Sequence, residues 1–265
     1  MSGDVDAVSR LDPCRPLYVE VVDRIEALAG RADVLGGGLV DRLVPACPSW
    51  TGRDLLGHLT GIAQDWVAGR LESYASTHWT AEHVARNAQL SLPDLMAAWR
   101  TAVGELGTTH HPQLGAPWRW LFGDASIHEA DLYEASGLGG GPPEPAIQVA
   151  FGQIVGRWRH EVVGASAGSR WPGLLLVDPA RRSWSIDSDH TAERRAPEAA
   201  DRSPVAVSPL SVKAPVQELW RMLTGRLSLD EIRALDWSDD PSPVFDRALP
   251  FPFRLAVRDA PSRTD

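Results

Sequence analysis

The chain has only two cysteines, Cys14 and Cys47, among its 265 residues. Two thiols are too few for a disulfide framework in a chain of this length, and the sequence contains no Cys-x-x-Cys pair that could bind zinc. A metal site in this protein would therefore use nitrogen and oxygen ligands. A cysteine in a turn is usually a small packing residue, so Cys47 as a nucleophile is the less favoured alternative.

Long apolar runs and an export signal are also missing. No stretch approaches the length needed to span a bilayer, and the first residues, "MSGDVDAVSRLDPC", are acidic and contain no apolar core. We therefore expect a cytoplasmic protein that does not bind to a membrane. The net charge of −9, from 35 acidic and 26 basic residues, repels phosphate backbones, so we do not expect nucleic acid as a partner.

Amphipathic helical patterns fill the first part of the chain, in which apolar residues recur at spacings of three and four. Thr51 and Asp54 predict a capped helix start, and Ser91 predicts another. The predicted helices are residues 15–29, the segment after Thr51, the segment after Ser91, residues 120–135 and residues 146–163. Short connections favour antiparallel neighbours, so residues 1–165 are expected to form an all-helical bundle domain.

After Trp171 the pattern changes to short segments rich in branched and aromatic residues. "GLLLVD" and "SWSIDSD", joined by "PARR", predict a β-hairpin, and "SPVAVSPL" could supply one more strand. The segment "VQELWRML" predicts a helix that ends near Gly225. Residues 166–265 are therefore expected to form a small α+β domain. The predicted fold class is an antiparallel helix bundle followed by this α+β domain.

Residues with metal-ligand chemistry stand on two of the predicted helices. Asp124 and His128 are four residues apart, so they lie on one face of a helix, about one turn from each other. His58 stands among leucines on the apolar face of another helix. Helix bundles build metal sites from such inward-facing side chains on different helices. Asp131, one further turn along, would accept a hydrogen bond from a ligand ring and orient it.

Each of these residues also has a purely structural interpretation. A histidine on an apolar helix face is often a hydrogen-bonded core residue. Asp124 follows Gly123, so it could lie in the first turn of its helix and interact favourably with the helix dipole. The spacing alone leaves these alternatives open, and only the combination of His58 with Asp124 and His128 makes a metal site an equal alternative.

The segment "VPACPSWTGRDLLGHLTGIAQDW" resembles the helix opening of the mycothiol-dependent maleylpyruvate isomerase family, a branch of the DinB-like metalloenzymes. The resemblance implies that His58 is the first metal ligand, and the later acidic residue and histidine of the family match Asp124 and His128, followed by Asp131. The C-terminal "VQELWRMLTGRLSLDEIRAL" is similar to the sterol-carrier-like tail domain of that family. The isomerases that best match the family name carry glutamate where this chain has Asp124, but aspartate is also a competent zinc ligand.

The resemblance implies an enzyme with a divalent cation, zinc, at His58, Asp124 and His128, and with mycothiol as a thiol cosubstrate. Three protein ligands leave one position of a zinc ion open, as in catalytic sites. The implied reaction is the isomerisation of a maleylpyruvate-like cis double bond. The alternatives are a mycothiol S-transferase acting on another small electrophile and a module that binds metal or a small molecule without turnover. The chain would act as a monomer or homodimer, with the tail domain as a lid or dimerisation element.

Overall fold

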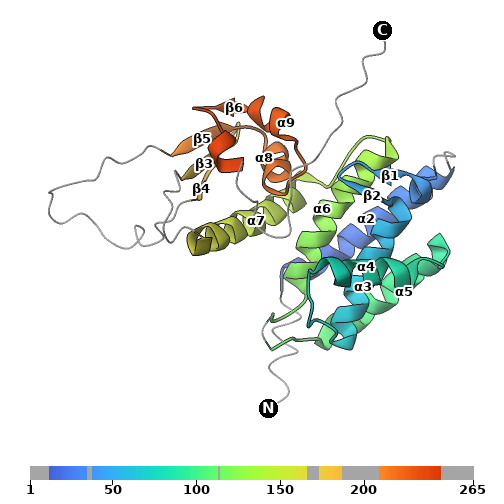
Figure 1. The fold of residues 1–265 in the computed structure, drawn as a ribbon. Coiled ribbons are helices and arrows are strands. Elements are labelled where there is room, and N and C mark those ends of the chain that lie inside the picture. The colour runs from blue at the N-terminus through green and yellow to red at the C-terminus, as the bar shows by residue number, and fades with distance from the viewer. Residues whose placement is uncertain (1–11, 35–37, 113, 166–172, 187–208, 246–265) are drawn as a thin grey trace, which may run out of the picture. The chain divides into compact units, whose positions relative to one another are not determined.

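A computed structural model of the protein describes residues 12–34, 38–112, 114–165, 173–186 and 209–245 (Figure 1). The chain divides into two compact units, Met1–Ala146 and Ile147–Asp265. The first unit is a helix bundle and the second is a small α+β unit, which confirms the predicted fold class. The division falls near the start of helix α7 (Glu144–Ala165), earlier in the chain than the boundary expected after residue 165.

Capping residues mark the start or the end of several helices of the first unit. Its α-helices within the described residues are α2 (Cys14–Val34), α3 (Gly52–Ala68), α4 (Thr77–Asn87), α5 (Leu92–Glu105) and α6 (Trp118–Ser136). Before α3, the Thr51 side chain accepts a hydrogen bond from the Asp54 N–H, and the Asp54 carboxylate accepts one from the Thr51 N–H, so the predicted capping box is confirmed. Ser91 caps α5 as predicted. Gly137, with φ of 67°, ends α6.

Helix α4 is an element that the sequence analysis did not predict. It begins after Ser76, whose hydroxyl accepts a hydrogen bond from the Trp79 N–H. Its buried residues are Trp79, His83 and Asn87, spaced four apart. Two of these three side chains are polar, so the apolar repeat that normally marks a buried helix face is weak.

A short β-hairpin precedes α3, so the expectation of an all-helical domain is wrong in this detail. Strands β1 (Leu43–Val44) and β2 (Cys47–Thr51) pair in antiparallel orientation. Gly52 begins α3 directly after β2, and a Cβ atom at this position would overlap the Leu39 carbonyl oxygen. The hairpin and the close approach at Gly52 therefore determine where α3 starts.

Helix α3 occupies the centre of the bundle and packs against α4, α5 and α6, while α2 packs against α6 (Figure 1). Large aromatic side chains fill the surrounding core, including Trp66, Trp99 and Trp118, all fully buried. The Trp99 indole N–H donates a hydrogen bond of 2.8 Å to the Tyr18 hydroxyl. A polar side chain on the buried faces of α3 is therefore removed from water and requires a partner.

The second unit combines α7 with a sheet whose strand order is β4-β3-β5-β6. The strands are β3 (Leu174–Val177), β4 (Ser183–Ile186), β5 (Leu210–Lys213) and β6 (Asp236–Trp237). The predicted hairpin is confirmed, because β3 and β4 are antiparallel, and β5 runs parallel to β3. Most of "SPVAVSPL" lies outside the described residues, and β5 begins at its last residue.

Three short helices complete the second unit within the described residues. They are α8 (Val216–Leu223), α9 (Leu229–Arg233) and α10 (Ser242–Phe245). Helix α8 confirms the predicted helix, and Gly225 follows it with φ of 73°. In the described ranges of the chain, no helix has both the length and the apolar character that crossing a membrane requires.

Candidate metal centre

His58 lies in the second turn of α3, and its side chain is only 5% exposed. The capping box at Thr51 sets the first turn, and the helical repeat then directs His58 to the same side as the buried Leu55 and Leu59. The ring of Trp50, in β2, packs against the imidazole with a centroid distance of 5.1 Å. The sequence interpretation of His58 as a buried polar residue on an apolar face is therefore confirmed.

Helix α6 carries Asp124 and His128 one turn apart. The helix begins at Trp118, so Asp124 lies in its second turn, and the interpretation of Asp124 as a first-turn residue is wrong. The next residue after His128, the fully buried Glu129, points elsewhere and accepts hydrogen bonds of 2.6 and 2.9 Å from the Arg24 guanidinium of α2. Burial raises the pKa of Glu129, and the Arg24 guanidinium opposes this increase. This ion pair holds α6 on α2 and thereby orients the face that carries Asp124 and His128.

The structure brings His58, Asp124 and His128 together. His58 Nε2 lies 3.7 Å from Asp124 Oδ2, and His128 Nε2 lies 3.8 Å from Asp124 Oδ1. The two imidazole rings are 5.5 Å apart between their centroids. One potential ligand atom from each of the three residues lies within 4.8 Å of the other two. Side chains from two helices thus meet around one carboxylate.

The donor atoms fit a single divalent ion. A tetrahedral zinc ion with nitrogen and oxygen ligands at roughly 2.0–2.2 Å keeps its ligand atoms about 3.4 Å apart. The separations of 3.7 and 3.8 Å run to the two different oxygens of Asp124, and one ligand atom from each of the three residues lies within 4.8 Å of the others, so side-chain rotations are needed to bring three atoms to this distance. The Asp124 side chain is 34% exposed, whereas the His128 side chain is 10% exposed. Asp124 is therefore the most exposed of the three side chains.

Asp131 supports His128 from within the same helix. His128 Nδ1 lies 2.9 Å from Asp131 Oδ2, and the Asp131 side chain is 1% exposed. An ionised carboxylate only accepts hydrogen bonds, so the Nδ1–H of His128 donates to Asp131, and the other ring nitrogen, Nε2, is the one near Asp124. Asp131 therefore lies where its predicted orienting role requires.

His58 has a different support, which the sequence analysis did not identify. Its Nδ1 lies 3.3 Å from Nδ1 of His83, which α4 contributes. His83 Nε2 lies 2.9 Å from Asp65 Oδ2, and Asp65 stands on α3 two turns after His58. Asp65 also accepts hydrogen bonds from Arg70 and Arg86 at 2.8 and 2.7 Å. The only sequence signal for this arrangement was the spacing of Trp79, His83 and Asn87 after Ser76.

Burial and neighbouring charges set the protonation of this cluster. Burial lowers the pKa of His58 well below its ordinary value, and His128 and His83 lower it further. His58 is therefore neutral at neutral pH, as a metal ligand must be. Burial raises the pKa of Asp65, but the hydrogen bonds from His83, Arg86 and Arg70 outweigh burial and hold this pKa below its ordinary value. Asp65 is therefore ionised.

Cys47 lies next to the cluster. One potential ligand atom from each of Cys47, His128 and Asp131 lies within 4.8 Å of the others. Thiolates are good zinc ligands, so this is a second combination to consider. In the combination with Cys47, the carboxylate of Asp131 already binds His128 Nδ1. In the combination of His58, Asp124 and His128, Nε2 of both histidines lies near the Asp124 carboxylate. The group His58, Asp124 and His128 is therefore the better candidate.

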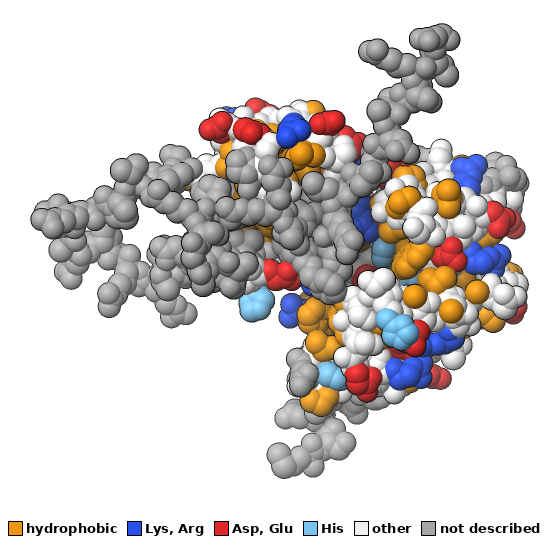
Figure 2. All heavy atoms as spheres, in the orientation of Figure 1, with side chains coloured by type: hydrophobic (Ala, Val, Ile, Leu, Met, Phe, Trp, Pro, Cys, Tyr) orange, Lys and Arg blue, Asp and Glu red, His pale blue; other side chains and the backbone are white. Residues whose placement is uncertain are grey.

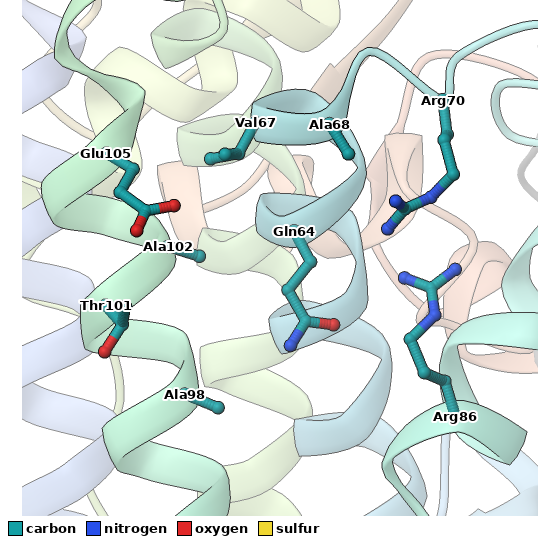
Figure 3. Close-up of a pocket in the computed structure, with 9 residues that line it drawn as sticks. All are labelled: Gln64, Val67, Ala68, Arg70, Arg86, Ala98, Thr101, Ala102 and Glu105. Atoms are coloured by element: carbon teal, nitrogen blue, oxygen red, sulfur yellow. The ribbon is translucent and has the colours of Figure 1, made fainter.

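A separate pocket lies among α3, α4 and α5 (Figure 3). Its volume is about 480 Å³, and its lining residues are Gln64, Val67, Ala68, Arg70, Arg86, Ala98, Thr101, Ala102 and Glu105. None of the three candidate ligands lines it, so it is not the access route to the cluster. The Arg70 and Arg86 side chains point toward one another at one side of this pocket (Figure 3).

Comparison with known proteins connects the helical unit to one family. Residues 21–133 match the family model described as the mycothiol maleylpyruvate isomerase N-terminal domain. This range contains His58, Asp124, His128 and Asp131, so the family resemblance inferred from the sequence is confirmed for the helical unit. The match does not include the second unit, whose similarity to a sterol-carrier-like domain stays a prediction.

Two crystal structures are similar to most of the chain, and both matches cover 87% of this chain and 93% of the other chain. One is the mycothiol-dependent maleylpyruvate isomerase, with 15% sequence identity and a TM-score of 0.49. The other is a mutant of the mycothiol-dependent maleylpyruvate isomerase, with 14% identity and a TM-score of 0.48. These values are too low to add to what the family model shows. None of the curated proteins compared with the chain matches it.

Proposed function

We propose that the protein is a mycothiol-dependent enzyme in which His58, Asp124 and His128 hold a divalent metal ion, zinc. The observation that carries this proposal is the convergence of two imidazole nitrogens and one carboxylate oxygen, with Asp124 the most exposed of the three side chains. The match of residues 21–133 to the mycothiol maleylpyruvate isomerase N-terminal domain supports the choice of thiol. We also propose a cytoplasmic location and a small electrophile as substrate.

Zinc at this site would supply Lewis acidity, which lowers the pKa of an incoming thiol and so increases its nucleophilicity. The protein contributes the side chains that surround and orient the ligands of the zinc ion. Asp131 orients the His128 ring through Nδ1, and burial favours the neutral form of His58, which metal ligation requires. The buried side chains around His58 exclude water from the inner side, and the partly exposed Asp124 faces the side from which the reactants enter.

The proposed reaction is the isomerisation of a maleylpyruvate-like cis double bond. The mycothiol sulfur adds to one alkene carbon and a proton adds to the other, which converts the double bond into a single bond. Rotation about this bond followed by loss of the same proton and sulfur gives the trans alkene and returns the thiol. If the sulfur stays attached, the same site performs an S-transfer, and the electrophile then differs from maleylpyruvate.

The test is to purify the protein, measure its metal content, and incubate it with mycothiol and maleylpyruvate. We expect bound zinc and formation of the trans isomer without net loss of thiol. Thiol consumption with an adduct detected by mass spectrometry would instead identify an S-transferase. Bound metal without either reaction would favour a binding module. Protein that binds no divalent metal at neutral pH would contradict the proposal.

A further inference from the structure

A chain of buried hydrogen-bonding groups extends from the candidate metal cluster along the interface of α3 and α4. It comprises His58, His83 and Asp65, and we call these three residues the His58–His83–Asp65 relay. His58 Nδ1 lies 3.3 Å from His83 Nδ1, and His83 Nε2 lies 2.9 Å from Asp65 Oδ2. The His83 side chain is fully buried and that of Asp65 is 1% exposed, so water does not satisfy these groups.

When both imidazole rings are neutral, the donor and acceptor capacities of these groups leave one arrangement of protons. Asp65 accepts two guanidinium hydrogen bonds on Oδ1, so it is ionised and its Oδ2 accepts a hydrogen bond from His83 Nε2. A neutral His83 with its proton on Nε2 has an acceptor at Nδ1. The facing His58 Nδ1 must then donate its proton, and the lone pair of His58 Nε2 is left toward Asp124.

The surrounding structure holds the His83 ring in one place. A Cβ atom at Gly61 of α3 would overlap Cβ and Cγ of His83, so α4 can approach α3 this closely only at a glycine. The Asn87 side-chain amide donates a hydrogen bond of 2.9 Å to the Gly57 carbonyl, which ties α4 to α3 one turn away. The Trp79 ring packs against the other side of His83 at a centroid distance of 4.2 Å.

Two arginines hold the outer end of the relay. Arg70 follows α3 and Arg86 belongs to α4, and their guanidinium groups point toward one another at the side of the pocket (Figure 3). Both donate to Oδ1 of Asp65, which leaves Oδ2 for His83. The positive charges keep Asp65 ionised although it is buried, and an ionised Asp65 is what requires the proton on His83 Nε2.

We infer that His83 and Asp65 are positioning residues that fix the His58 ring, with its proton on Nδ1, so that Nε2 is available to the metal ion. The inference rests on the proposed function, since it concerns how one ligand of that site is prepared. It assigns a role to α4, which supplies none of the three ligands. Outer groups that orient a ligand histidine typically change metal affinity by roughly 10–100-fold when they are removed.

A first experiment reads the tautomers directly in the full-length, metal-free protein. Long-range ¹H–¹⁵N correlation spectra at neutral pH distinguish a protonated from an unprotonated ring nitrogen. We expect a proton on Nδ1 of His58 and on Nε2 of His83. A proton on Nε2 of His58, or on Nδ1 of His83, would overturn the inference whether or not the protein binds metal.

A second experiment uses two variants of His83, each of which keeps only one of the two contacts that the His83 ring makes, with His58 or with Asp65. His83→Asn places an amide oxygen near the former Nδ1 and keeps an acceptor for His58. His83→Gln places its amide near the former Nε2 and keeps the contact with Asp65 alone. Both remove the ring, so each controls for the lost packing of the other, and thermal unfolding of the metal-free proteins checks that both are folded.

Zinc affinity is then measured by competition with a chromophoric chelator. We expect His83→Gln to lose about 10–100-fold in affinity and His83→Asn to retain most of it. Equal affinities of the two variants would show that His83 only fills space and would overturn the inference. Wild-type protein with the expected tautomers but no zinc binding would refute the proposed function and leave the relay standing.

Discussion

The two histidines of the candidate metal centre have contrasting surroundings. His128 is supported by Asp131, three residues later on the same helix, at 2.9 Å. His58 is supported by His83 from a different helix, and His83 in turn depends on Asp65. Both supports end in a carboxylate with 1% side-chain exposure, so the chemistry is the same although the origin in the chain differs.

The difference shows what each support depends on. The support of His128 requires only that α6 is helical, because residues three apart on a helix are neighbours. The support of His58 requires that α4 lies against α3 at Gly61, and it therefore couples the metal centre to the packing of two helices. A change in helix packing should reach His58 but leave the contact between His128 and Asp131 intact.

The largest effect on zinc affinity is expected from removing the imidazole ring of either His58 or His128, and the two variants should behave alike. His58→Ala and His128→Ala should each lower zinc affinity by more than the roughly 10–100-fold that is typical of changes around a ligand. Metal content after gel filtration and chelator competition measure this. His78→Ala is the control, because it removes an imidazole that is 80% exposed. Full zinc content in both ligand variants would rule out the assignment of these two ligands.

The next largest effect on zinc affinity is expected from removing Asp131, which supports His128 from within the same helix. Asp131→Ala should lower zinc affinity by about 10–100-fold, since the His128 ring loses the acceptor that orients it. Chelator competition gives the affinity, and the tautomer of His58 in the metal-free protein should not change. Glu134→Ala, which removes a carboxylate from the same helix, serves as the matched control. An affinity equal to that of the wild type would show that Asp131 does not orient the ligand.

A smaller effect should come from Gly61→Ala, which disturbs the support of His58. The added methyl group overlaps His83, and such overpacking of a core costs about 1–3 kcal/mol in the free energy of unfolding. Gly30→Ala in α2 is the control, because nothing lies within 4 Å of its Cβ position and alanine should stabilise the helix by about 0.5–1 kcal/mol. Urea unfolding of the metal-free proteins measures both, and the same direction of change in the two variants would contradict the prediction.

The smallest effect is a pH dependence that comes from the buried ring. The pKa of His58 is lowered from its ordinary value of 6.5 in the folded protein, so below this pH the unfolded chain binds a proton that the folded chain does not. The free energy of unfolding of the metal-free protein should therefore fall as the pH decreases, with a slope approaching about 1.4 kcal/mol per pH unit. Urea unfolding between about pH 7.5 and 5.5 should show a shallower slope for His58→Gln. Identical slopes for the two proteins would be incompatible with a neutral, buried His58.

Local features of the fold were predictable. The starts of α3 and α5 follow from Thr51 and Ser91, because a capping side chain bonds to backbone groups within three residues. Helix α4 was missed because its buried face includes His83 and Asn87, which look like surface residues in a pattern of hydrophobicity. The partners that make these polar side chains acceptable in the interior come from α3, far from them in the sequence.

The composition also predicted that the surface would carry both acidic and basic side chains. On the face of the helical unit that Figure 2 shows, acidic and basic side chains of the described residues are interspersed.

The sequence by itself determined that Asp124, His128 and Asp131 share one face of a helix, because the helical repeat relates residues within two turns regardless of what surrounds them. Only the tertiary structure decided that His58 meets this face and that His83 and Asp65 stand behind it. The physical reason is that these contacts join different turns and helices through side-chain packing. Packing depends on how whole surfaces fit together, which no local pattern of residues contains.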